Sequence, residues 1–159
     1  GRALTFAHKV GQDTLIQYEL FAGGVGAMAD YPGETGCHCN QTNGKITAIE
    51  MLETEFPIRV ERFMVRDGSG GEGRFRGGNG FLREYRILDG LAAVTLRSSK
   101  HAVRPQGING GDDGEGGFCQ TKINGETIML ASMQSGIALN PNDTLTLGTP
   151  GGGGFGRPF

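Results

Sequence analysis

The stretch between residues 67 and 80 reads DGSGGEGRFRGGNG, and it constrains the fold more than any other part of the chain. Glycine in a helix interior costs roughly 1 kcal/mol relative to alanine. A run this rich in glycine therefore favours turns, positive φ angles or close approach of backbones. β-Branched, aromatic and long side chains dominate 58–66 and 80–88, and arginines and glutamates interleave throughout. The pattern predicts two strands joined by an ordered, partly salt-bridged loop.

Short apolar runs elsewhere indicate further strands. They lie at 4–8, 14–21, 91–97, 118–123, 126–130 and 144–147. Asn124-Gly125 is typical of a type I′ hairpin turn, and Asp89-Gly90 predicts another tight turn. Thr47 and Glu50 fit a capping box that would start a helix of two turns, and Pro57 would end that helix.

The chain of 159 residues is predicted to form one domain, 1–159, that is mainly β, or β-rich α+β. We expect an antiparallel sheet or a barrel-like sheet, with long glycine-rich loops and one or two short helices. Thirty glycines and the lack of tryptophan favour loops, turns and β-structure. Only 36% of the residues are apolar, so the domain is expected to depend on neighbouring chains for part of its burial.

Charge and cysteine content narrow the class of protein. A net charge of −2 without long blocks of like charge gives no support for binding to nucleic acid or to a membrane surface. No run approaches a transmembrane helix or a signal peptide. Three cysteines fit a reducing cytosol better than a disulfide framework, so a cytoplasmic location is expected. The chain begins Gly-Arg-Ala without methionine, from which we expect a processed or cleaved piece.

Two glycine patterns test the possibility of nucleotide binding. Gly68–Gly73 and Gly151–Gly156 both match G-x-G-x-x-G. In dinucleotide-binding folds this pattern opens a helix whose N-terminal amides hold the pyrophosphate. Neither segment precedes a predicted helix, and no G-x-x-x-x-G-K-[ST] sequence occurs. We interpret these glycines as residues that shape turns.

The metal-ligand candidates are Cys37, His38 and Cys39, with His101 and Cys119 distant in sequence. Thiolate and imidazole groups are zinc ligands. The C-x-C spacing is tighter than the usual C-x₂₋₄-C, and no second paired motif exists. Oxygen ligands for a harder metal are also present, at Asp30, Asp112 and Asp113. Unliganded loop cysteines are the favoured interpretation, and no metal site is assigned.

No residue set predicts a catalytic nucleophile or an acid–base pair. No serine lies in a G-x-S-x-G elbow. Ser98 to His101 contains nucleophile and base types, but adjacent residues on a strand face opposite sides, so a polar strand end is the simpler interpretation. Glu50 and Glu53 could share a helical face as paired carboxylates. Capping by Glu50 and a solvent role for Glu53 are simpler.

Five segments resemble the C-terminal part of the hydantoinase B family, in the order of that family. They are Tyr18-Glu19 with GGVGA at 23–27; His38 to Asn43 leading into AIEMLE at 48–53; FPIRVERF at 56–63; DGSGGEGRFRGGNGFLREYRIL at 67–88; and TPGGGGFG at 149–156. The family includes the B subunit of N-methylhydantoinase, the matching half of 5-oxoprolinase, and subunits of acetone and acetophenone carboxylases. One departure is Gly68, because the family more often runs directly from Asp to Ser.

The resemblance implies a C-terminal fragment of a B-type subunit in a hetero-oligomeric, ATP-dependent enzyme. Such enzymes phosphorylate a carbonyl or amide oxygen, for ketone carboxylation or for hydrolysis of cyclic amides such as hydantoin and 5-oxoproline. ATP and Mg²⁺ would bind a hydantoinase A-like partner with an actin-type ATPase fold. A divalent metal, Zn or Mn, would belong to the upstream part of the subunit. No catalytic residue is carried over to this chain.

The competing interpretation is a non-catalytic module that supports assembly. It places the loops at 67–80, 106–117 and 149–156 away from any cleft. An enzyme component would instead place one of them, or the loop at 37–43, beside a substrate cavity. The candidates for that cavity are His38, Asn43, Arg76, Gly77 and Gly78.

Overall fold

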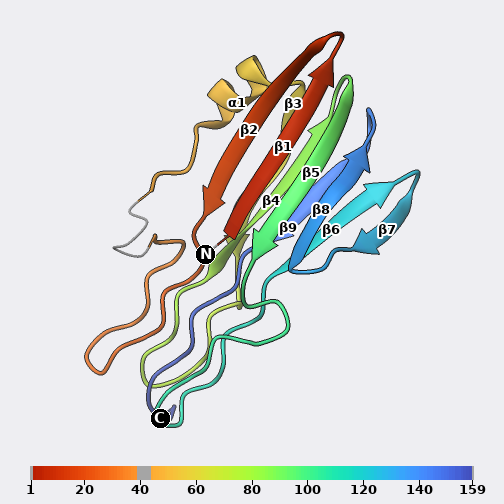
Figure 1. The fold of residues 1–159 in the computed structure, drawn as a ribbon. Coiled ribbons are helices and arrows are strands. Elements are labelled where there is room, and N and C mark those ends of the chain that lie inside the picture. The colour runs from red at the N-terminus through yellow and green to blue at the C-terminus, as the bar shows by residue number, and fades with distance from the viewer. Residues whose placement is uncertain (1, 39–43, 159) are drawn as a thin grey trace.

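A computed structural model describes residues 2–38 and 44–158, in which the chain forms nine strands and one helix (Figure 1). They are β1 (Arg2–Val10), β2 (Asp13–Phe21), α1 (Ile49–Glu55), β3 (Ile58–Arg66), β4 (Gly80–Ile87), β5 (Leu91–Ser98), β6 (Phe118–Ile123), β7 (Glu126–Met129), β8 (Met133–Leu139) and β9 (Thr144–Gly148). The strands form two antiparallel sheets, ordered β2-β1-β5-β8 and β3-β4-β9-β6-β7. The predicted mainly β, antiparallel fold is confirmed.

The two sheets pack face to face around one hydrophobic core. Alternation along β1, β4 and β5 supplies much of this core, because successive side chains face opposite sides of a sheet. Leu4 and Phe6 of β1 are fully buried, as are Leu145 of β9 and Tyr85 of β4 from the opposite sheet. Leu52 of α1 closes one end of the core.

The predicted hairpins are present. β3 pairs with β4 in antiparallel register, and β6 pairs with β7. Between β6 and β7, Asn124 and Gly125 have φ angles of 50° and 85°, as a type I′ turn requires. The turn at Asp89-Gly90 carries the chain from one sheet to the other, since β4 and β5 belong to different sheets.

Two features differ from the predictions. The capping box at Thr47 and Glu50 is wrong: Ala48 is the N-cap, and it makes no side-chain capping hydrogen bond. The helix is held instead by packing of Leu52. Strand β8 was not predicted, because Gly136 interrupts its pattern. Gly136 has φ 72° and lies at a register shift opposite β5, so it forms part of a β-bulge.

Below the sandwich, four extended segments pack side by side and form what we call the glycine bundle (Figure 1). Its segments are 23–36, 67–80, 105–117 and 149–156. Backbone hydrogen bonds join them: Gly24 N donates to Pro150 O at 2.8 Å, and Asp112 N donates to Glu72 O at 2.7 Å. Gly68 is different, because it has φ 78° and open space around it. It lies in a turn that Ser69 N closes on Arg66 O, so the extra residue is accommodated there.

The segment 149–156 runs through the middle of the bundle and turns with a period of three. Side chains added at Gly151 and Gly154 would both meet the 69–72 segment, at Ser69 O and Glu72 O. One at Gly152 would meet Val25 O, and one at Gly153 would meet Gln106 O. Three directions in three residues match the polyproline II helix rather than a β-strand. Only glycine allows neighbours on all three sides.

Candidate functional site

Three of the predicted cavity residues, Arg76, Gly77 and Gly78, lie in the glycine bundle. Gly77 N donates to Gly71 O at 2.9 Å, and Gly78 N donates to Val25 O at 2.9 Å. Arg76 is 44% exposed and pairs with Glu72 at 3.0 Å, so the predicted salt bridge in this loop is confirmed. The two glycines hold the bundle together, whereas Arg76 presents its side chain at the surface.

The two G-x-G-x-x-G segments lie beside each other in this bundle. Several of their amides already have backbone acceptors: Gly71 N donates to Gly152 O, and Gly152 N donates to Gly78 O, both at 2.8 Å. Gly154 N donates to Asp112 O at 2.9 Å. A pyrophosphate site needs amides directed at the ligand from a helix N-terminus. The residues of these segments do not fit a nucleotide, in agreement with their interpretation as structural glycines.

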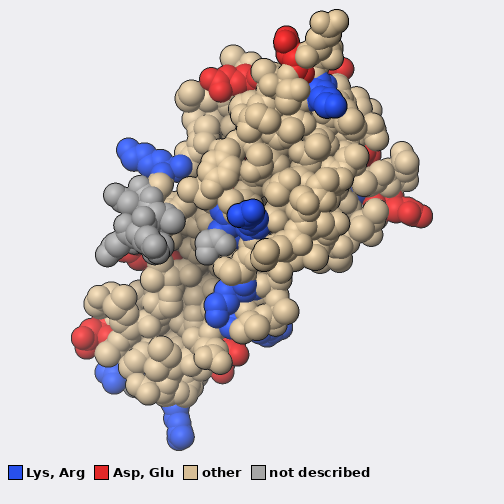
Figure 2. All heavy atoms as spheres, viewed as in Figure 1, with Lys and Arg blue, Asp and Glu red and all other residues tan. Residues whose placement is uncertain are grey.

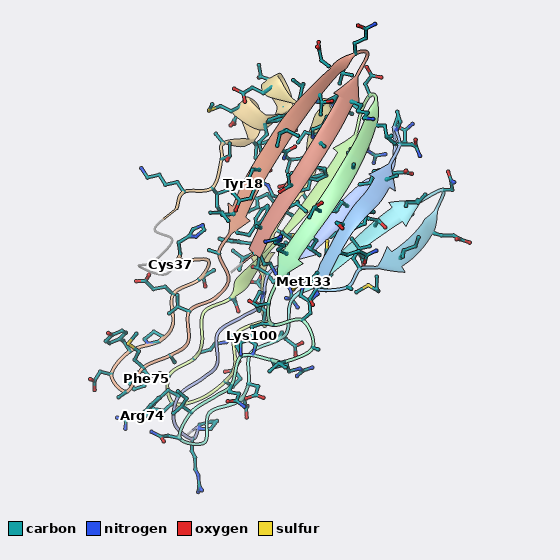
Figure 3. The ribbon with its side chains drawn as sticks, viewed as in Figure 1. Tyr18, Cys37, Arg74, Phe75, Lys100 and Met133 are labelled. Carbon is teal, nitrogen blue, oxygen red and sulfur yellow. The ribbon has the colours of Figure 1, made fainter. Side chains whose placement is uncertain are left out.

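The 37–43 loop lies only partly within the described residues, because Cys39 and Asn43 fall outside them. Thr35 and Gly36, which precede this loop, both bind Asn79. Gly36 N donates to Asn79 O at 3.1 Å, and Asn79 N donates to Thr35 Oγ1 at 3.1 Å. Cys37 is exposed beyond this contact, well away from Arg74 and Phe75 at the lower end of the bundle (Figure 3). The His38 ring lies against Gly44. Their role at a cavity stays a prediction.

The candidate metal ligands that the structure describes do not form a metal site, and Cys39 lies outside the described residues. Within residues 2–38 and 44–158, no group of three or more His, Cys, Asp or Glu side chains is placed to hold a metal ion. Cys119 is fully buried in the core, and burial raises the pKa of its thiol to about 12. Without a bound metal its sulfur therefore remains protonated at neutral pH. Asp113 instead accepts a hydrogen bond from Gly107 N at 2.8 Å.

A buried polar chain crosses the core, and sequence reasoning missed it. Arg83 Nη1 donates to Glu19 Oε2 at 2.8 Å, and Tyr85 donates its hydroxyl to Glu19 at 2.9 Å. Gln17 Nε2 donates to the same carboxylate. His8 completes the chain through Gln17 Oε1 at 2.9 Å. The period-two pattern could have revealed it, because alternation directs Gln17 and Glu19 to the core face.

These contacts determine the state of His8. Gln17 uses its amide nitrogen for Glu19, so its oxygen faces His8, and His8 Nε2 must carry the proton. The ring stacks on Phe6 with centroids 5.3 Å apart, and burial lowers the pKa of His8. Burial likewise raises the pKa of Tyr85 well above its usual range. The network therefore holds a neutral imidazole, a neutral phenol and one ion pair.

The state of His8 leads to a pH prediction. Because the folded protein holds His8 with a lowered pKa, the unfolded chain binds the proton first as pH falls through 6.5. Stability is thus fully present above pH 6.5 and declines below it. His8→Asn should flatten this slope by up to about 1.4 kcal/mol per pH unit. Urea unfolding of both proteins at several pH values measures it. An unchanged slope would contradict the buried neutral imidazole.

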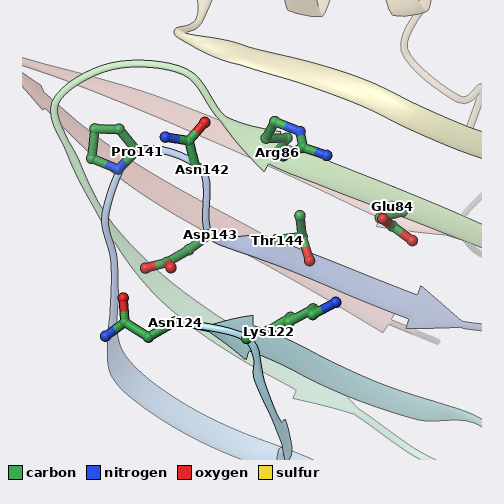
Figure 4. Close-up of a pocket in the computed structure, with 9 residues that line it drawn as sticks. Glu84, Arg86, Lys122, Asn124, Pro141, Asn142, Asp143 and Thr144 are labelled. Carbon is green, nitrogen blue, oxygen red and sulfur yellow. The ribbon is translucent and has the colours of Figure 1, made fainter.

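A groove lies on the outer face of the second sheet, and the predicted site residues that the structure describes do not line it (Figure 4). Its volume is about 430 Å³. Glu84 and Arg86 of β4, Lys122 of β6 and Asp143 border it. Arg86 pairs with Glu61 at 2.6 Å, and Asp143 accepts from Asn140 N at 2.8 Å. Most of its charged groups are thus already engaged by the protein itself.

No helix in the described part of the chain is long and apolar enough to cross a membrane.

The polar groups described above either form hydrogen bonds between backbone segments or bury charge in the core. They form no arrangement of nucleophile, base and oxyanion donors among the described residues.

Comparison with known proteins gives consistent results. A family model described as Hydantoinase B/oxoprolinase matches residues 2–158. A 5-oxoprolinase of Dictyostelium discoideum is 40% identical over 148 residues, which is 92% of this chain and 12% of that protein. The 5-oxoprolinase 1 of Arabidopsis thaliana is 33% identical over 146 residues, which is 92% of this chain and 12% of that protein. The chain thus spans a small part of the length of these relatives.

Two solved structures share the fold. An ATP-dependent caprolactamase from Pseudomonas jessenii superposes with a TM-score of 0.81 at 22% identity, over 99% of this chain and 30% of that one. An acetone carboxylase in its nucleotide-free form superposes with a TM-score of 0.79 at 16% identity, over 98% of this chain and 25% of that one.

Proposed function

The chain belongs to the hydantoinase B/oxoprolinase family, and on that basis we propose that it is the C-terminal β-sandwich of a B-type component in a cytoplasmic, multi-component, ATP-dependent enzyme. The complete enzyme would activate an amide or carbonyl oxygen by phosphorylation. The observation that carries the proposal is coverage: 92% of this chain aligns with 12% of a 5-oxoprolinase. A sequence that fills one region of a much larger enzyme is expected to act with the remaining regions.

Nucleotide and metal are assigned to other parts of the assembly. Several glycine amides of the two G-x-G-x-x-G segments already donate to backbone acceptors, which argues against a nucleotide at these segments. ATP and Mg²⁺ are therefore proposed to bind a hydantoinase A-like ATPase component. The described residues also lack a metal-binding group, so a divalent Zn or Mn ion is proposed to bind the upstream part of the B-type component.

The outer face of the first sheet supports contact with such partners. Ile16 and Tyr18 of β2 point away from the core and are 58% and 59% exposed. On the face shown in Figure 2, most of the area over β2, β1, β5 and β8 is uncharged, with Lys or Arg atoms over its lower part. Exposed large apolar side chains on such a sheet face are typical of an interaction surface.

Cyclic amide hydrolysis is the reaction we favour, and ketone carboxylation is the second candidate. Identity of 40% to a 5-oxoprolinase supports the first. The shared fold with acetone carboxylase supports the second, at 16% identity. Purified assembly should cleave ATP when 5-oxoproline or hydantoin is added without bicarbonate. ATP cleavage that requires both acetone and bicarbonate would instead establish the second reaction.

A matched pair of substitutions tests whether this chain borders the substrate cavity. Arg76 and Arg104 each form an exposed ion pair on the bundle, with Glu72 at 3.0 Å and with Glu115 at 3.5 Å. Arg76→Ala should lower turnover at least tenfold in the intact assembly, whereas Arg104→Ala should leave it unchanged. Equal turnover in both variants would favour the alternative, a non-catalytic module that supports assembly.

A further inference from the structure

In the described part of the chain the two sheets end in four edge strands, and three of these carry a feature that hinders pairing with another strand. β3 has a bulge between Val60 and Arg62, and Glu53 of α1 accepts a hydrogen bond from Val60 N at 2.8 Å. β8 has the bulge at Gly136. β7 is only four residues long. Bulges, covered amides and short strands are means by which proteins keep sheet edges from pairing.

The fourth edge, β2, has none of these features among its described residues (Figure 1). Its nine residues pair with β1 in one unbroken register, and they include no proline, lysine or arginine. Ile16, Tyr18 and Leu20 follow one another along its outer face and are 58%, 59% and 37% exposed. A long, regular and apolar edge strand is a template for pairing with another chain. We therefore expect this edge to be covered in the functional protein.

The register identifies the backbone groups of β2 that are directed outward. Along an antiparallel pair, the backbone groups of successive residues point alternately toward and away from the partner strand. Val10 and Asp13 close the two-residue turn between β1 and β2, so Asp13 and every second residue after it bond to β1. The groups that point away belong to Thr14, Ile16, Tyr18 and Leu20. Within residues 2–38 and 44–158, no backbone group outside the β1–β2 ladder forms a hydrogen bond with them.

We propose that the edge of β2 binds an extended segment from the rest of the B-type component, which adds a fifth strand to the first sheet. This inference rests on the proposed function, because it requires a longer protein around this chain. The aligned region is only 12% of a related 5-oxoprolinase, so most of such a protein remains to supply the segment. Main-chain hydrogen bonds from the outward groups of β2 would hold it, as in other cases of strand addition to a sheet edge.

The side chains of β2 determine which segment fits. On the outer face, the added strand would lie beside Ile16 and Tyr18, where β-branched and aromatic residues pair favourably. On the inner face it would lie beside Gln17 and Glu19, which are buried, with Glu19 already bonded to Arg83 at 2.8 Å. Acidic residues are disfavoured there, since like charges on neighbouring strands repel. The expected segment therefore alternates large apolar residues with small or neutral polar ones.

A structure of the intact assembly tests the pairing and its source. A backbone segment from the rest of the B-type component, about 4.8 Å from β2 and hydrogen-bonded to it, supports the proposal. A second copy of β2 at that position, or an edge without any added strand, would overturn it. A hetero-oligomer with an ATPase-like component but an uncovered β2 edge would leave the proposed function standing, so the two failures are distinguishable.

Hydrogen exchange of the intact assembly, resolved to single amides, tests the same contact in solution. The outward amide of Ile16 should exchange at least about a hundredfold more slowly than an unprotected amide of the same sequence. Exchange of Ile16 at the unprotected rate would contradict the added strand.

Variants at Tyr18 separate backbone pairing from contact through the side chain alone. Tyr18→Pro removes an outward N–H but leaves the ladder to β1, a position at which an edge strand tolerates proline. It should speed the exchange of Ile16 by at least about tenfold, whereas Tyr18→Ala keeps the N–H and should change it little. Thr127→Pro is the matched control, because Thr127 N–H points outward from β7. Equal exchange of Ile16 in the original protein and all three variants would contradict the proposal.

Discussion

Gly24→Ala is expected to prevent the protein from folding or to destabilise it by more than about 4 kcal/mol. A Cβ at this position would lie 1.8 Å from Gly78 O and 2.7 Å from Gly152 N. Both atoms are backbone, and both belong to segments packed on several sides, so neither can move aside locally. The yield of soluble protein and the urea midpoint measure the effect.

Gly26→Ala is the matched control two residues further along the same segment. Its nearest neighbour would be Gly153 O at 3.7 Å, which is ordinary van der Waals contact. We expect it to change stability by no more than about 1 kcal/mol. Similar losses of stability in the two variants would show that the bundle is not packed as described, because the same substitution at the two sites differs only in what the added Cβ contacts.

Arg83→Met should cost about 3–5 kcal/mol, because it leaves the Glu19 carboxylate buried without its cation. The side chains of this pair are 1% and 3% exposed. The guanidinium of Arg83 also lies over the ring of Phe63, with Cζ 4.9 Å from the ring centroid, so Arg83→Met loses that contact as well. Equilibrium urea unfolding measures the loss.

Arg86→Met provides the comparison on the same strand. Its pair with Glu61 is 38% and 29% exposed, and solvent screening limits such a pair to about 1 kcal/mol or less.

Adding Glu19→Leu to Arg83→Met should recover much of the lost stability, because the unpaired buried charge is then removed. If the double variant is no more stable than Arg83→Met, the unpaired Glu19 charge is not what destabilises the Arg83→Met protein.

Local patterns predicted most of the strands because those patterns are determined by neighbouring residues. The alternation at 144–147 and the Asn124-Gly125 turn carry their geometry within a few positions. Strand β8 escaped prediction because its bulge at Gly136 is defined by the partner strand β5. The capping box at Thr47 failed for a similar reason. The N-cap is Ala48, and Thr47 O instead accepts a hydrogen bond from Arg83 at 3.4 Å, a contact that local sequence does not encode.

The candidate site was less predictable than the fold. The glycines at 77 and 78 could be recognised as unusual, but only the packing shows that each contacts a different neighbouring backbone. The pairing of Glu19 with Arg83 joins two strands of different sheets, separated by 64 residues. Sequence alternation can place each side chain on a face, but it cannot say which faces meet. Gly77 and Gly78 of the family motif thus hold the bundle together.

Native mass spectrometry of the untagged protein from its source, followed by denaturing mass measurement of each component, determines whether this chain acts as part of a larger enzyme. We predict that the chain is found in a hetero-oligomer that also contains a longer B-type region and an ATPase-like component. A stable monomer of this chain alone, with neither of those components, would show that it is not part of such an enzyme.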